Sequence, residues 1–133
     1  MKFSIPFNRR VFRDFGLFVV PALIEHQGRS LYMPMIIDSA ASYLTVRPDV
    51  FAQLGITPIR KAPLITASER TEASLGQVEK VTAGGRCSAV NVKVISISLP
   101  EALPAEGLLG ASFLRNFLVS MDYDTGKFEL TTK

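Results

Sequence analysis

Short apolar runs follow one another along most of the chain, and Gly, Pro or polar residues separate them. Leu17–Ile24 and Ser30–Ile37 are rich in β-branched, aromatic and aliphatic residues, and Gln27-Gly28-Arg29 between them has the composition of a turn. This pattern predicts a β-hairpin. The second strand leads directly into Asp38, so the hairpin places a carboxylate at the end of an apolar run.

The same pattern predicts further strands towards the C-terminus. Pro63–Thr66 and Leu75–Val78 could form the arms of a second hairpin around a polar tip, and Val90–Ile97 alternates as a half-buried strand does. Leu118–Tyr123 and Lys127–Thr132 flank a polar turn and predict a closing hairpin.

Only two short segments have the pattern of helices. The first begins with Pro48, a residue favoured at the first helical position, and Gly55 supplies its end. The second is the amphipathic segment Ser112–Phe117, for which we expect Ser112 to be the N-cap. Many short strands with two brief helices predict an all-β, barrel-like domain.

Length and composition predict one domain. The 133 residues, 47% of them apolar, suffice for a single core. Residues 1–16 mix Phe with basic residues and are expected to form an N-terminal arm or edge segment outside the core, so the domain is assigned to residues 17–133. The start of the chain lacks the features of a signal peptide, and no apolar run is long enough to span a bilayer. We expect a cytoplasmic protein with no membrane partner.

Charge and cysteine content exclude several classes of function. The net charge of +3 is mild, and Arg9, Arg10 and Arg13 are not followed by a basic stripe with aromatic residues, so we expect no nucleic-acid partner. Cys87 is the only cysteine, which excludes an internal disulfide and a cysteine-based zinc site. With a single histidine, His26, we expect no metal and no cofactor.

Asp38 is the residue whose placement most needs an explanation. Strand interiors disfavour Asp, and an ionised carboxylate beside apolar groups is costly unless it is paired or hydrogen-bonded. The small residues of the segment 39–42 allow a backbone, a second chain or a substrate to approach it. The structural alternative is that Asp38 only begins an Asx-type turn at the end of a strand.

Other catalytic patterns are missing, which leaves carboxylate chemistry. His26 lies beside a turn, no G-x-S-x-G elbow exists, and no Gly-rich phosphate loop precedes a helix. Two carboxylates a few ångströms apart cannot both ionise, so they share a proton and can act as base and acid. A two-fold dimer would bring Asp38 of one chain against its own copy.

The segment Asp38-Ser39-Ala40-Ala41-Ser42 resembles the Asp-Thr/Ser-Gly-Ala-Ser motif of retropepsin-like aspartic proteases. Leu108-Leu109-Gly110, followed by a short helix, is similar to the second motif of that family. The closing Asp-Tyr-x-x-Gly-Lys-x-x-Leu pattern and the helix end Phe51-Ala52-Gln53-Leu54-Gly55-Ile56 are similar to bacterial members. The resemblance covers about Leu17 to Leu130.

The resemblance implies a closed β-barrel subunit with a flap hairpin, acting as a homodimer that hydrolyses peptides or proteins. Asp38 would be the catalytic residue, with Ser39 at the dimer axis, Ala41 at the Ala position of the motif and Ser42 near the substrate backbone. The flap that closes over a bound peptide would include four polar or small residues, Thr66, Ala67, Ser68 and Glu69.

Ala40 departs from the family motif, which has Gly at this position. A negative φ would tolerate the methyl group but crowd the substrate or the opposing loop, and a positive φ would strain the loop. Two alternatives to a working peptidase follow: an impaired dimer that binds peptides, and a structural module that assembles other proteins. The triplet Asp124-Thr125-Gly126 matches the motif literally, but it lies in a polar turn, and we favour Asp38.

Overall fold

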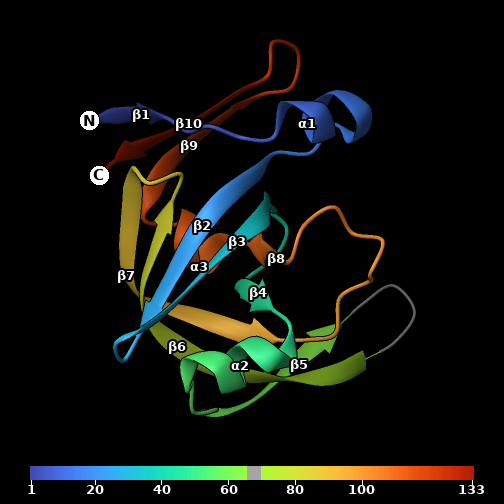
Figure 1. Cartoon of the computed structure of the whole chain (residues 1–133), viewed down its shortest axis with the longest axis vertical. Coiled ribbons are helices and arrows are strands. Elements are labelled where there is room, and N and C mark those ends of the chain that lie inside the picture. The colour runs from blue at the N-terminus through green and yellow to red at the C-terminus, as the bar shows by residue number, and fades with distance from the viewer. Residues whose placement is uncertain (66–69) are drawn as a thin grey trace.

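Ten strands and three short helices make up the described chain (Figure 1). The computed structural model describes residues 1–65 and 70–133, and the side chains of 1–63 and 73–133. The elements are β1 (Lys2–Ser4), α1 (Arg9–Phe15), β2 (Val19–His26), β3 (Arg29–Ile37), β4 (Leu44–Val46), α2 (Pro48–Leu54), β5 (Arg60–Ile65), β6 (Arg70–Ala83), β7 (Cys87–Ser96), β8 (Gly107–Leu109), α3 (Ala111–Leu114), β9 (Phe117–Asp122) and β10 (Lys127–Thr132).

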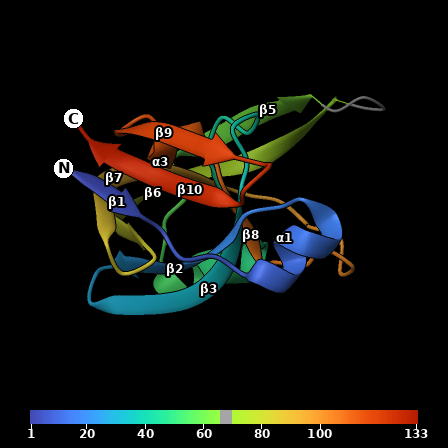
Figure 2. The same cartoon turned by 90° about the horizontal axis from the view of Figure 1, so that it is seen from above.

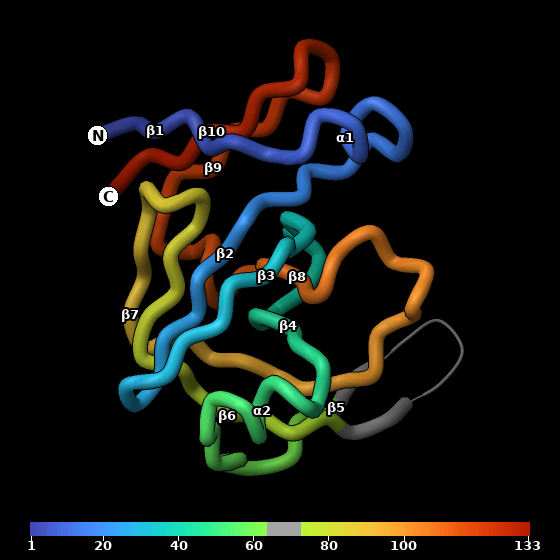
Figure 3. Tube along the Cα trace, in the orientation of Figure 1, coloured from blue at the N-terminus to red at the C-terminus, as the bar shows by residue number. Residues whose placement is uncertain are grey.

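Six strands close into a barrel, and β5 extends the sheet beyond β6. The strand order is β2-β3-β8-β4-β7-β6-β5, and pairing between β2 and β6 completes the ring. Most neighbours are antiparallel, but β3 pairs with β8 and β4 with β7 in parallel. The path of these strands around the barrel can be followed in Figure 3. The all-β, barrel-like architecture predicted from the sequence is confirmed.

A second sheet of three strands lies across one end of the barrel, in the order β1-β10-β9 (Figures 1 and 2). The first and last strands therefore pair within one chain, with Phe3 opposite Leu130. Phe18 of the barrel contacts Phe128 and Tyr123 of this second layer, with ring centroids 5.9 and 5.1 Å apart. Apolar packing thus joins the sheet to the barrel.

The barrel interior is filled by aliphatic and aromatic side chains. The alternation along β2 and β3 sends Val20, Ile24 and Met35 inward, where they are fully buried. Helix α2 covers one opening with Val50, Phe51 and Leu54, all of them buried. This burial follows the predicted pattern, because apolar residues on one face of a short helix gain most from contact with a core.

Three local predictions from the sequence are confirmed. The hairpin β2–β3 pairs His26 with Arg29 around the predicted turn, and β9–β10 forms the closing hairpin. Helix α2 begins at Pro48 and ends at Leu54, and the C-cap Gly55 has a left-handed φ of 67°, which suits a residue without a Cβ. Among the helices of the described chain, none is long and apolar enough to cross a membrane.

Two predictions about secondary structure were wrong. The predicted arms Pro63–Thr66 and Leu75–Val78 leave residues 67–74 as the polar tip of the second hairpin, whereas β6 begins at Arg70 and pairs Arg70 with Ile65. The start of β6 is a strand because its backbone pairs with β5. Its sequence lacks the apolar alternation from which a strand is predicted. The N-terminal segment also contains α1, a third helix, and Ile5 is buried in the core at 2% exposure. Residues 1–16 therefore contribute to the core as well as to a sheet edge.

Candidate active site

Asp38 continues the end of β3, next to β8. The parallel pairing places Ile36 beside Leu108 and Ile37 beside Leu109. The ladder runs one step further, because the Asp38 backbone N–H donates to the Leu109 carbonyl oxygen at 3.0 Å. The two segments singled out in the sequence, 38–42 and 108–110, are therefore neighbours in the fold. The side chain of Asp38 is half-buried.

The Asp38 carboxylate begins a turn. Its Oδ1 accepts a hydrogen bond from the Ala40 N–H at 3.0 Å, and its backbone carbonyl accepts one from the Ala41 N–H at 3.2 Å. This is the Asx-type geometry of the structural alternative. No described residue forms an ion pair with Asp38. The turn holds the carboxyl group by one oxygen and leaves Oδ2 without a hydrogen bond to the described chain.

Ala40 takes a backbone conformation that suits a side chain. Among the described residues other than glycine, only Gln27 and Asn91 have a positive φ. Of the two outcomes considered for Ala40, a strained loop is therefore wrong, and the methyl group is sterically tolerated in the chain itself. Ser39 and Ala40 are exposed. The Ala40 residue is thus accessible at the surface of the chain.

Gly110 allows the loop after Asp38 to lie directly against the start of α3. A Cβ on Gly110 would lie 2.5 Å from the Tyr43 carbonyl oxygen and 2.6 Å from that of Ala41. The same approach brings the Ala111 N–H to the Ala41 carbonyl oxygen at 2.7 Å and the Ser112 N–H to that of Ser42 at 3.0 Å. The unpaired N–H groups of a helix start therefore hold the loop.

Ser112 has a role that sequence reasoning missed. The predicted N-cap was wrong, because Gly110 occupies that position and Ser112 lies inside α3. Its hydroxyl accepts from the Leu44 N–H and donates to the Lys93 carbonyl oxygen, both at 2.7 Å. One hydroxyl thus connects α3, β4 and β7 behind the Asp38 loop. A serine two positions past a cap carries no sequence signal for contacts so distant along the chain.

Two pockets flank the segment that follows Asp38. The first, of about 350 Å³, begins at Ala40 and Ala41, and none of its described lining residues has a charged side chain. Its walls come from the Asp38 loop, β4, β5, β6, β8 and the chain around the end of β7. The lining residues are Ala40, Ala41, Ser42, Tyr43, Thr45, Ala62, Pro63, Ala73, Ile95, Ile97 and Leu108. We call it the apolar pocket.

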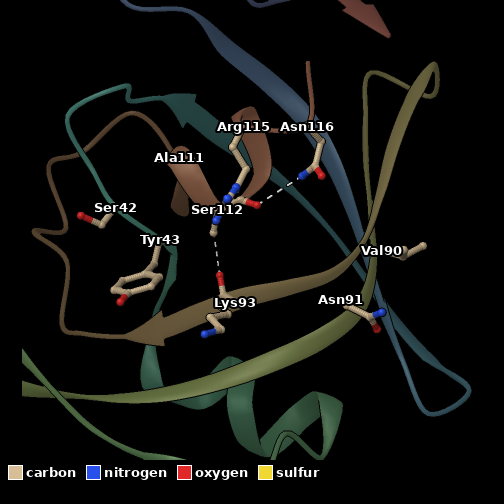
Figure 4. Close-up of a pocket in the computed structure, with 9 residues that line it drawn as sticks. All are labelled: Ser42, Tyr43, Val90, Asn91, Lys93, Ala111, Ser112, Arg115 and Asn116. Carbon is tan, nitrogen blue, oxygen red and sulfur yellow. Dashed lines mark hydrogen bonds between the residues drawn. The ribbon is translucent and has the colours of Figure 1, made fainter. Parts of the chain in front are cut away.

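The second pocket is larger, about 690 Å³, and lies between α3 and β7 (Figure 4). It shares Ser42 and Tyr43 with the apolar pocket but does not reach Ala40. We call it the α3–β7 pocket. The α3–β7 pocket is the larger of the two, but the lining of the apolar pocket comes closer along the chain to Asp38, since it begins at Ala40.

The predicted flap residues and Asp124 are not part of this site as the structure describes it. Thr66, Ala67, Ser68 and Glu69, predicted for the flap, lie outside the described residues. Asp124 lies in the β9–β10 turn, where its backbone N–H donates to Oδ1 of Asp122 at 2.9 Å.

That turn is ordered by Asp122 rather than by Asp124. Hydrogen bonds from the Thr125 hydroxyl and from backbone N–H groups lower the pKa of Asp122 below its usual value. The arrangement is that of a polar turn, which accounts for the acidic and hydroxyl residues found there.

Two comparisons with known proteins find similarity to aspartic proteases. A family model described as "Aspartyl protease" matches residues 20–113. The fold is similar to the crystal structure of a retropepsin-like aspartic protease from Rickettsia conorii, with a TM-score of 0.65 and 20% sequence identity. That match covers 98% of this chain and 89% of the other. No curated protein matches the sequence.

Proposed function

The chain belongs to the aspartyl protease family, with a retropepsin-like fold, and we propose that it is an endopeptidase whose catalytic residue is Asp38. The observation that carries this proposal is the position of Asp38 at the end of β3. Its backbone is fixed by Leu109, one carboxylate oxygen is held by Ala40, and the apolar pocket begins at the next residues.

A single chain supplies one such carboxylate, so the proposed enzyme is a homodimer with Asp38 from each copy at a two-fold axis. Two facing carboxylates share a proton. The ionised one takes a proton from water, the resulting hydroxide adds to the peptide carbonyl carbon, and the protonated one gives its proton to the carbonyl oxygen. The tetrahedral intermediate then breaks the C–N bond as a proton passes to the leaving amine.

A strand edge that has no partner in the described part of the chain supports such a dimer. Strand β9 is an outer strand of the three-stranded sheet, and Leu118 and Val119 on it are 61% and 38% exposed. Figure 2 shows β9 on the same side of the molecule as the connection between β3 and β4, which carries Asp38. An apolar edge without Pro or Lys invites pairing with another strand. We propose that β9 of the second copy fills this edge.

Ala40 supports a second candidate, a dimer that binds peptides but cleaves them slowly or not at all. Its exposed methyl group lines the apolar pocket, where a substrate backbone would approach Asp38. Ala40→Gly removes this group without relieving strain. A large gain in cleavage rate would identify the natural protein as an impaired enzyme, whereas an unchanged rate would show that the methyl group is harmless.

The test of the proposed function compares two isosteric variants. The protein is incubated with an unfolded protein at acidic to neutral pH, and the fragments are identified by mass spectrometry. Asp38→Asn should abolish cleavage, and the matched Asp124→Asn should retain it. Loss in both variants or in neither would overturn the assignment of Asp38. Failure of the unaltered protein to cleave, with retained peptide binding, would instead support the second candidate.

A further inference from the structure

The α3–β7 pocket is lined by cations without a matching acid. Its described lining is Ser42, Tyr43, Val90, Asn91, Lys93, Ala111, Ser112, Arg115 and Asn116, and none of these side chains is acidic. Lys93 belongs to β7 and Arg115 directly follows α3, so the charges come from opposite walls (Figure 4). Neither forms an ion pair with any described residue.

A third cation lies close by, and two of the polar side chains between the walls, Ser112 and Asn116, are already hydrogen-bonded within the chain. The Lys133 ammonium group donates to the Arg115 carbonyl oxygen at 3.0 Å. The Ser112 hydroxyl is used by Leu44 and Lys93, and the Asn116 amide nitrogen donates to the Ser112 and Phe113 carbonyl oxygens. Because the described lining carries two cations and no acidic side chain, the charge of the pocket favours an anionic ligand.

The position of the α3–β7 pocket indicates the class of anionic ligand. Ser42 and Tyr43 line both pockets and form the boundary between them. A peptide with one side chain in the apolar pocket would continue along this boundary, and alternate side chains of an extended chain point to the same side. A side chain further along the same peptide would thus enter the α3–β7 pocket.

Resting on the proposed function, we propose that the α3–β7 pocket is a specificity site that selects peptides with an Asp or Glu side chain near the bound apolar residue. Lys93 and Arg115 bind the carboxylate. The substrate class is then an apolar-acidic polypeptide segment rather than any unfolded chain. Both cations are exposed, so each contributes modestly, and we expect the acidic peptide to bind about three- to tenfold more tightly than its amide counterpart.

The test measures binding, so that it does not depend on catalysis. Short fluorescent peptides with one central apolar residue carry a single Glu, or Gln in its place, at each successive position. Binding to Asp38→Asn protein is followed by fluorescence anisotropy at low and high salt. We expect one position at which Glu binds more tightly than Gln, with a difference that shrinks at high salt because the charges are exposed.

Charge variants assign this preference to the pocket. Lys93→Gln and Arg115→Gln, made in the Asp38→Asn protein, should each reduce the Glu preference. Arg86→Gln removes an equal charge from the exposed β6–β7 turn and should leave it unchanged. Equal binding of Glu and Gln peptides at every position would overturn the proposal, as would a preference that survives removal of both pocket cations. Cleavage by unaltered protein, measured separately, decides the proposed function.

Discussion

Replacing Gly110 by Ala is the sharpest single perturbation of the loop that carries Asp38. The added Cβ would lie 2.5 and 2.6 Å from two backbone oxygens, those of Tyr43 and Ala41. Backbone cannot rotate away as a long side chain can, so the loop must move. Movement weakens the hydrogen bonds from Ala111 and Ser112 that hold the loop.

The cost follows from these contacts. Overpacking of this kind costs about 1 to 3 kcal/mol, and each weakened hydrogen bond adds about 0.5 to 1.5 kcal/mol. The expected loss in the free energy of unfolding is about 2 to 6 kcal/mol. For 133 residues this corresponds to a fall in Tm of about 7 to 20 °C. Thermal unfolding followed by circular dichroism measures it.

Gly85→Ala is the matched control. Gly85 has a φ of 66° and no atom within 4 Å of a built Cβ, so it tests backbone conformation without close contact. Its expected cost is about 1 to 2 kcal/mol. Gly110 does not have a positive φ, so its whole effect should come from contact. A Gly110→Ala protein that unfolds no earlier than Gly85→Ala, and that cleaves peptides normally, would refute this account of the loop.

Three further predictions concern Ser112 behind the Asp38 loop, the edge of β9 and the β9–β10 turn. Ser112→Ala removes a hydroxyl that makes two hydrogen bonds. It should lower the free energy of unfolding, measured by urea denaturation, by about 1 to 3 kcal/mol. Ser112→Thr keeps a hydroxyl and serves as the comparison. Leu118→Lys should weaken the proposed dimer about tenfold or more. It should leave the unfolding of the monomer nearly unchanged, since exposed positions tolerate substitution. Equal sedimentation of the unaltered and the Leu118→Lys protein would contradict the β9 interface. The pKa of Asp122 is lowered in the folded state, so the ionised Asp122 carboxylate stabilises the β9–β10 turn above its usual pKa. This stabilisation is lost as the pH falls through the lowered pKa. The backbone NMR shifts of residues 122–126 should follow the titration of Asp122, and this response should be missing in Asp122→Asn.

The strands and turns around Asp38 could be predicted because their signals are local. Apolar alternation, Pro48 at a helix start and Gly55 at its end each act within a few residues. The same was not true of Arg70–Ser74, which has little apolar alternation and is a strand through its backbone pairing with β5. Ile5 is buried because β1 pairs with β10 at the far end of the chain, a contact that no local pattern encodes.

The candidate site likewise has features that the sequence predicts and features that depend on contacts between distant segments. Asp38 stands out in the sequence because a carboxylate interrupts an apolar run, and the segment 108–110 stands out by resemblance to a known motif. The role of Ser112 depends on three elements meeting behind the loop, and the charges of Lys93 and Arg115 meet across a pocket only in the folded chain. Long-range placement of this kind requires the structure.

Mixing of subunits tests whether two Asp38 carboxylates share one site. Equal amounts of unaltered and Asp38→Asn protein are unfolded together, refolded and assayed for peptide cleavage. If each site needs Asp38 from both copies, random pairing leaves about one quarter of the activity of the same total amount of unaltered protein. Retention of about one half, the result for chains that act singly, would contradict the shared site.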